Sequence, residues 1–248
     1  MTRRGKLTSL VVLTAFASSL VAAAGAQATY HQNFIREVHE GNGTTVGDYV
    51  ELQAYSAGEN LVAGKHIVSY DAGGSVLTNF IIPSNVSNAA NQATILIASD
   101  ASTPGADFLA STDLNVDNTG GTVCYTDGSI AAKLDCVAFD GTGGAPVTVP
   151  AGAAFGAPFA LPGPNLNGQS LVRTISRGCA TALDPADDTN SAADFTLGAG
   201  SPRGNSATPT ETPCPPATAK KKKKCKKHKK KSGAYSAKKH KCKKKKHH

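Results

Sequence analysis

Short runs of β-branched and aromatic residues recur along the middle of the chain, and polar clusters rich in glycine separate them. In several runs the apolar side chains alternate with polar ones, as Val50, Leu52 and Ala54 do with their neighbours. A period of two is typical of a β-strand. Few apolar residues recur at a spacing of three or four, so the pattern predicts no helix in this region.

The runs predict up to nine strands between residues 33 and 176. Their ranges are 33–40, 48–55, 65–71, 75–83, 93–99, 113–116, 122–127, 134–139 and 170–176. Turn clusters such as EGNG, DAGG, DNTGG and DGTGG lie between them. Seven to nine short strands with frequent turns predict an all-β fold, an antiparallel β-sandwich.

The N-terminus is typical of an export signal. Residues 1–28 begin with basic residues, continue with an apolar run from Leu7 to Ala24, and end in a small-x-small triplet at 26–28. We expect cleavage before Thr29. The alternative is a membrane anchor, because the length of the apolar run is borderline for a spanning helix. The alanine and serine content of the run and the cleavage triplet favour removal.

Composition divides the rest of the chain into four parts. We expect the sandwich core over 29–142, a loop insertion with the closing strands over 143–205, a Pro/Thr linker over 206–219, and a disordered lysine-rich tail over 220–248. No apolar run after the signal is long enough to span a bilayer. The mature protein is therefore predicted to be secreted or held at the cell surface.

Charge is distributed very unevenly along the chain. The tail from Lys220 holds 17 lysines and no acid, and three basic residues stand before residue 7. Six of the 26 Lys and Arg residues remain between these ends, together with all 18 acids, so the middle carries a net charge of −12. The formal net charge of +8 is thus an average of two opposite regions, of which only the tail should attract polyanions.

The tail is expected to bind anionic cell-envelope polymers without specificity, with nucleic acid as the alternative partner. The lysines expected to make these contacts are Lys220, Lys221, Lys222, Lys223, Lys224, Lys226, Lys227, Lys243, Lys244, Lys245 and Lys246. The tail has no arginine and a single aromatic residue, Tyr235, so it is poorly suited to base stacking or bidentate recognition. Its own acidic body is a third candidate partner.

Six cysteines enter a compartment that permits disulfides if the chain is exported. Three bridges could form in fifteen ways. Proximity in the sequence favours Cys124–Cys136, Cys179–Cys214 and Cys225–Cys242. An alternative for the tail is a zinc or copper site made of Cys225, His228, His240 and Cys242, which the neighbouring ammonium groups and an oxidising compartment disfavour.

Candidate chemistry in the middle region is sparse. It has three histidines and no recognised nucleophile, metal-protease or phosphate-loop motif. His39 and Glu40 could supply a base and an acid, but exposed polar residues are ordinary at a strand end. The clusters at 117–121 and 140–144 could bind calcium, yet turn chemistry explains them equally well. We therefore predict no enzyme, no cofactor and no metal.

Several of these segments together resemble a lamin tail domain. Residues 35–76 contain Glu-Val at 37–38, the Asp-aromatic-Val-Glu-Leu strand at 48–52, a Leu-x-x-Gly step at 61–64 and the DAGG turn at 71–74. That order is similar to the opening of such a domain, with tyrosine where tryptophan is usual.

Two later segments extend the resemblance. Residues 114–141 are similar to the Gly-Gly hairpin near the end of a lamin tail domain, and residues 187–205 resemble the closing Asp-Phe and Pro-x-Gly-Asn segment of secreted bacterial members. The resemblance implies an immunoglobulin-like sandwich and a non-catalytic module. Secreted members often stand beside nucleases or hydrolases, and no such domain is seen in this sequence.

Overall fold

The computed structural model describes residues 32–41, 47–116, 120–141, 146–163, 166, 168–212 and 214. The predicted export signal and the lysine-rich tail lie outside the described residues. The same holds for the polyanion-binding lysines and for the alternatives of a Cys225–Cys242 bridge or a metal site in the tail.

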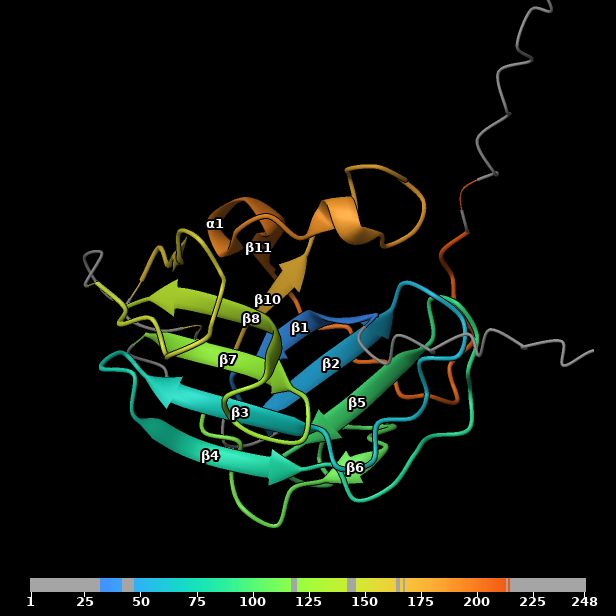
Figure 1. Cartoon of the computed structure of the whole chain (residues 1–248), viewed down its shortest axis with the longest axis horizontal. Coiled ribbons are helices and arrows are strands. Elements are labelled where there is room, and N and C mark those ends of the chain that lie inside the picture. Colours follow the sequence, from blue (N-terminus) through green and yellow to red (C-terminus); the bar gives the residue numbers. More distant parts are fainter. Residues whose placement is uncertain are drawn as a thin grey trace, which may run out of the picture. The chain divides into compact units, whose positions relative to one another are not determined.

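The described strands form two sheets, seen in Figure 1 as layers whose strands run in different directions. Sheet A has the order β11 (Phe195–Gly198), β10 (Ser170–Arg173), β1 (Asn33–His39), β2 (Tyr49–Ala54), β5 (Thr94–Ala98) and β6 (Phe108–Leu109). Sheet B has the order β4 (Val76–Ile81), β3 (His66–Asp71), β7 (Gly121–Thr126), β8 (Lys133–Asp140) and β9 (Phe159–Ala160). The predicted all-β sandwich is confirmed. Its pairs are antiparallel except β5–β6 and β8–β9, which are parallel.

The main core lies between the sheets, because each central strand places alternate apolar side chains on its inner face. Ile35, Leu52 and Ile97 of sheet A pack in one cluster with Val123 and Phe139 of sheet B. All six residues of β2 are buried, the polar ones included. The outer face of sheet A must therefore be covered as well, and the segment after β11 covers it.

Eight of the nine predicted strands overlap a strand of the structure. Residues 113–116 do not: Leu114 is buried in the core, but Asn115 has a φ of 46°, which breaks an extended run. The pattern also missed β6, β9 and β11, and it missed a single helical turn, α1 (Ser191–Asp194), that follows the 3₁₀ turn η1 (Pro185–Asp187). Elements of two to four residues are too short to produce a period.

The proline-punctuated region after β8 packs against the sandwich. Phe155 covers the outer face of sheet B, where it contacts a cluster with Val68 and Tyr70, while Leu161 belongs to the core between the sheets. Near the C-terminal end of the described chain, the Thr212 N–H donates to the carbonyl of Thr181 over 2.9 Å. Residues with linker composition are thus bound to the sandwich as far as this point.

Two of the predicted disulfides are present. Cys124 and Cys136 stand directly opposite each other on β7 and β8, with their Cα atoms 4.1 Å apart, on the outer face of sheet B beneath Phe155. Cys179 and Cys214 are joined over a Cα distance of 5.6 Å. The second bridge fastens the end of the described chain to the loop before η1.

Candidate functional site

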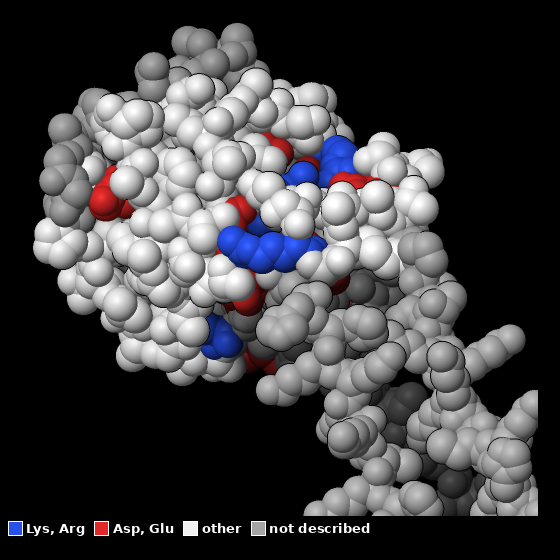
Figure 2. All heavy atoms as spheres, turned by 90° about the horizontal axis from the view of Figure 1, so that it is seen from above, with Lys and Arg blue, Asp and Glu red and all other residues white. Residues whose placement is uncertain are grey.

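The basic side chains of the sandwich are largely occupied within the fold. All six of the middle region lie among the described residues, and five have acceptors there: Lys65 with Asp127, Lys133 with two carbonyls, Arg173 with Asp135, Arg177 with Asp194, and Arg203 with Glu51 and Glu211. On the face drawn in Figure 2, Lys and Arg atoms form small separate groups with Asp and Glu atoms beside them. The described surface therefore offers no basic stripe that could track a polyanion.

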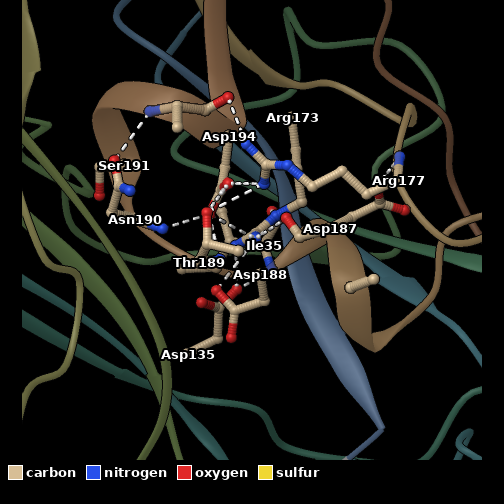
Figure 3. A network of polar contacts seen from close by, with 12 residues as sticks. Ile35, Asp135, Arg173, Arg177, Asp187, Asp188, Thr189, Asn190, Ser191 and Asp194 are labelled. Carbon is tan, nitrogen blue, oxygen red and sulfur yellow. Dashed lines mark hydrogen bonds and ion pairs between the residues drawn. The ribbon is translucent and has the colours of Figure 1, made fainter. Parts of the chain in front are cut away.

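The most elaborate polar site surrounds Arg173 at the end of β10 (Figure 3). The Arg173 side chain is 1% exposed, and its Nη2 lies 2.7 Å from the Oδ2 atom of Asp135 on β8. Its Nε donates to the carbonyl of Ile35 on β1 over 2.8 Å, and its Nη1 donates to the carbonyl of Asp187 over 3.1 Å. One guanidinium thus joins both sheets to the turn at η1.

Further carboxylates complete this network. Asp188 lies 3.2 Å and Asp194 3.8 Å from Nη1 of Arg173. Burial alone would lower the pKa of Arg173, but the charges of Asp135, Asp188 and Asp194 outweigh it and raise that pKa. Desolvation raises the pKa of Asp135, and the charge of Arg173 opposes the rise. Asp194 also receives the backbone N–H groups of Thr189 and Asn190, which closes the loop before α1.

This arrangement is suited to holding the fold rather than to chemistry on a ligand. The ring centroids of Phe34 and Phe195 lie 5.0 and 4.7 Å from the guanidinium carbon of Arg173, so aromatic side chains pack against this group inside the fold. Sequence reasoning did not single out the network. The available signal was the density of acids over residues 184–194 beside two arginines, in a chain with few bases.

A second buried polar cluster lies on the outer face of sheet A. The Tyr49 hydroxyl donates to Glu37 and lies 3.2 Å from the Ser170 hydroxyl, which is 2.9 Å from Nδ1 of His39. The His39 ring stacks on Tyr49, and desolvation lowers its pKa against the opposing charge of Glu37. The N–H of Ser201, in the covering segment, donates to Glu37 over 3.1 Å.

The structure separates His39 and Glu40, which were considered as a base and an acid. His39 is 5% exposed and lies under the segment after β11, whereas Glu40 lines an open hollow at the end of β1. The two side chains therefore do not converge on one site.

The open hollow is acidic. It has a volume of about 430 Å³, and Asp48 and Asp113 line both it and a neighbouring hollow of about 380 Å³ that includes Asp100. Desolvation raises the pKa of Asp48 to about 6, and the charge of Asp113 adds to the rise. Asp48 accepts the N–H groups of Gly41 and Val116 over 2.6 and 3.0 Å, which ties two loops together.

Metal chemistry has little support among the described residues. No group of three or more His, Cys, Asp or Glu side chains in this part of the chain is arranged to hold an ion. The clusters considered for calcium fall largely on residues 117–119 and 142–145, which lie outside the described residues.

A third hollow, of about 320 Å³, lies where the covering segment crosses sheet A. Arg203 places its backbone N–H 2.7 Å from Glu51 Oε2 and its Nη1 2.9 Å from Glu211, and Arg36 lines the same hollow. Burial raises the pKa of Glu51 to about 7, and the charge of Arg203 opposes the rise.

The fold and these clusters define a disulfide-bonded β-sandwich whose buried charges are compensated within the chain. No helix among the described residues is long and apolar enough to cross a membrane. No protein-family model matches the chain, and no curated protein matches its sequence. The resemblance to lamin tail domains therefore rests on the residues quoted above.

Proposed function

We propose that this chain is an exported, non-enzymatic immunoglobulin-like module of the lamin tail type. Its lysine-rich tail holds it at the cell envelope through contact with anionic polymers. The observation that carries the proposal is the separation of charge: 17 lysines without an acid follow residue 219, while the middle region has a net charge of −12. A protein built in this way attracts a polyanion at one end and repels it over the rest of its length.

The strength of the attachment follows from the number of lysines. Each lysine near an anionic surface contributes on the order of 1 kcal/mol, and the attraction decays over a Debye length of about 8 Å at physiological salt. Several simultaneous contacts therefore give firm adhesion that depends on salt. An ammonium group is a compact, strongly hydrated point charge. Lysine therefore responds to the charge of a polymer rather than to its shape, and the adhesion is not selective among polyanions.

The sandwich supports this proposal in two ways. Its two disulfides fit an oxidising compartment outside the cytoplasm. Its most buried charged groups, around Arg173, are bonded to one another and to the backbone, so the described part of the body offers a rigid carrier rather than a reacting centre.

Fractionation of producing cells tests the attachment. The full chain should remain with the envelope and be released by salt, whereas a chain ending at residue 219 should be found in the medium. A control with the order of residues 220–248 scrambled keeps the charge and should behave like the parent. Retention of the shortened chain, or adhesion of the full chain that persists in high salt, would contradict the proposal.

Binding to purified polymers separates the proposal from the nucleic-acid alternative. With duplex DNA, the logarithm of the binding constant should fall linearly with the logarithm of salt concentration, with a slope of about −0.9 for each phosphate neutralised. If the chain in cells is released by nuclease rather than by removal of envelope polymers, the nucleic-acid function replaces the envelope function.

A further inference from the structure

One edge strand of the described sandwich is longer than the others. Among the described residues the four sheet edges are β6 and β9, of two residues each, β11, of four, and β4, of six. Proteins commonly protect their edges by keeping the terminal strand short. Three edges follow that rule, and β4 (Val76–Ile81), at the border of sheet B in Figure 1, does not.

The backbone of β4 directs unpaired groups away from the sheet. Ile82, just after the strand, turns both its N–H and its carbonyl toward the β3 side, where they bond to Lys65 and Gly64 over 2.8 and 2.9 Å. Because these groups alternate along an antiparallel strand, those of Ile81 and Asn79 point outward. Among the described residues no backbone bond joins β4 to a segment other than β3.

The side chains of β4 make the edge apolar and uncharged. Val76, Leu77 and Ile81 are 45%, 42% and 53% exposed. No charged residue occurs between Asp71 and Asp100, in a region whose net charge is −12. Lysine, proline and inward charges protect many sheet edges, and β4 contains none of them. Its register against β3 shifts at Leu77, so the regular part of this edge is Thr78–Ile81.

The loop at 113–115 does not cover this edge. The Thr78 hydroxyl donates to the carbonyl of Asp113 over 2.9 Å and receives the amide of Asn115 over 2.8 Å. Thr78 is buried and points into the sandwich, so these bonds close the space between the sheets beneath β4. Among the described residues they occupy none of the outward backbone groups of Asn79 and Ile81.

We propose that β4 pairs with β4 of a second copy of this chain. An antiparallel pair with a two-fold axis between the two Asn79 residues lets each Asn79 give and accept one backbone bond. The same register places Leu77 of one copy opposite Ile81 of the other, so apolar side chains meet across the axis. The two five-stranded sheets become one continuous sheet of ten strands.

The absence of charge on β4 permits a second copy as the occupant. Two acidic bodies repel each other, and the repulsion is smallest where they meet through a segment without charges. The lysine-rich tail is a poor occupant of the same edge, because its ammonium groups would lose hydration against Leu77 and Ile81. In the proposed register each β4 strand pairs with an identical β4 strand, so no other protein is required.

The mass of the mature chain in solution tests the proposal. Light scattering after size exclusion in high salt, where association through the tail is screened, should give twice the mass of one chain. Ile81→Lys should give the mass of one chain, because it places a charge in each half of the interface. Ile130→Lys is the matched control: Ile130 is 41% exposed and lies between β7 and β8, so this variant should remain a dimer.

Cross-linking tests the register. In a hydrogen-bonded pair the facing Cα atoms are about 5.5 Å apart, within reach of a disulfide. Asn79→Cys should therefore give a covalent dimer under oxidation beyond any seen for the parent, whereas Leu77→Cys, which faces Ile81, should not. A parent chain with the mass of one copy at every concentration, a dimer that survives Ile81→Lys, or isolation of a different protein bound at β4 would overturn the proposal.

Discussion

Replacing Asp135 by asparagine should destabilise the sandwich strongly, because it removes one charge from a buried pair. Asp135 Oδ2 lies 2.7 Å from Nη2 of Arg173, and both side chains are 1% exposed. Asparagine has the same shape and keeps an oxygen for the N–H of Ile35, which Asp135 now accepts over 2.6 Å. The substitution therefore removes the charge, and it also turns the second carboxylate oxygen, which is buried without a hydrogen-bond partner, into an amide donor.

The expected magnitude follows from what remains around Arg173. Removing one partner of a buried ion pair costs about 3–5 kcal/mol, because the other charge is left without compensation. Asp188 and Asp194 stay within 3.2 and 3.8 Å of Nη1, which places the expected loss at the lower end, about 3 kcal/mol. For a domain of this size that loss corresponds to a fall in Tm of roughly 6–12 °C.

Urea unfolding with the disulfides intact measures this loss. Asp188→Asn is the matched control: the Asp188 side chain is 37% exposed, and an ion pair of this kind contributes about 0–1 kcal/mol. The double variant Asp135→Leu with Arg173→Met should be less destabilised than the sum of its parts, since it removes both charges of the buried pair and Asp194 keeps its ion pair with Arg177. If Asp135→Asn and Asp188→Asn cost the same, the network does not act as a buried pair and the reasoning fails.

Three more predictions concern the bridge, the pH response and export. Cys124→Ser should lower the unfolding free energy by roughly 3 kcal/mol through the opened loop to Cys136, with calorimetry as the readout. Glu51 has its pKa raised to about 7. The folded chain therefore holds the extra proton, and this contribution to stability falls as pH rises from about 4.5 to about 7. Glu51→Gln should remove that part of the pH dependence in denaturant titrations. N-terminal sequencing of the mature protein should begin at Thr29, and a chain that retains Met1 contradicts the signal.

Alternation of side chains was sufficient to predict the central strands. Val50 and Leu52 face the core between the sheets, and the facing pair Cys124 and Cys136 lies where a hairpin requires it. The edges were not predictable in the same way. Phe159–Ala160 becomes a strand only because β8 lies beside it, and two residues carry no period.

The polar clusters were hidden from sequence reasoning for a different reason. Asp135 and Arg173 are 38 residues apart, and only the packing of β8 beside β1 and β10 brings them together. Likewise Glu37 follows Arg36 and Tyr49 follows Asp48, as residues on a solvent-facing side often do, yet both Glu37 and Tyr49 are buried. Their burial depends on the segment after β11, whose composition gives no indication that it packs.

That segment also determines how the tail is connected to the sandwich. Arg203 forms an ion pair with Glu51, and Cys214 is joined covalently to Cys179. The Asn205 side chain accepts the backbone N–H of Asn88 and donates to the carbonyl of the same residue. In the proposed attachment, a load on the tail would enter the described chain at Cys214, where the disulfide connects it directly to the loop at Cys179. The disulfide would then share this load with the hydrogen bonds by which Ser201 and Arg203 hold the segment over the buried carboxylates of Glu37 and Glu51.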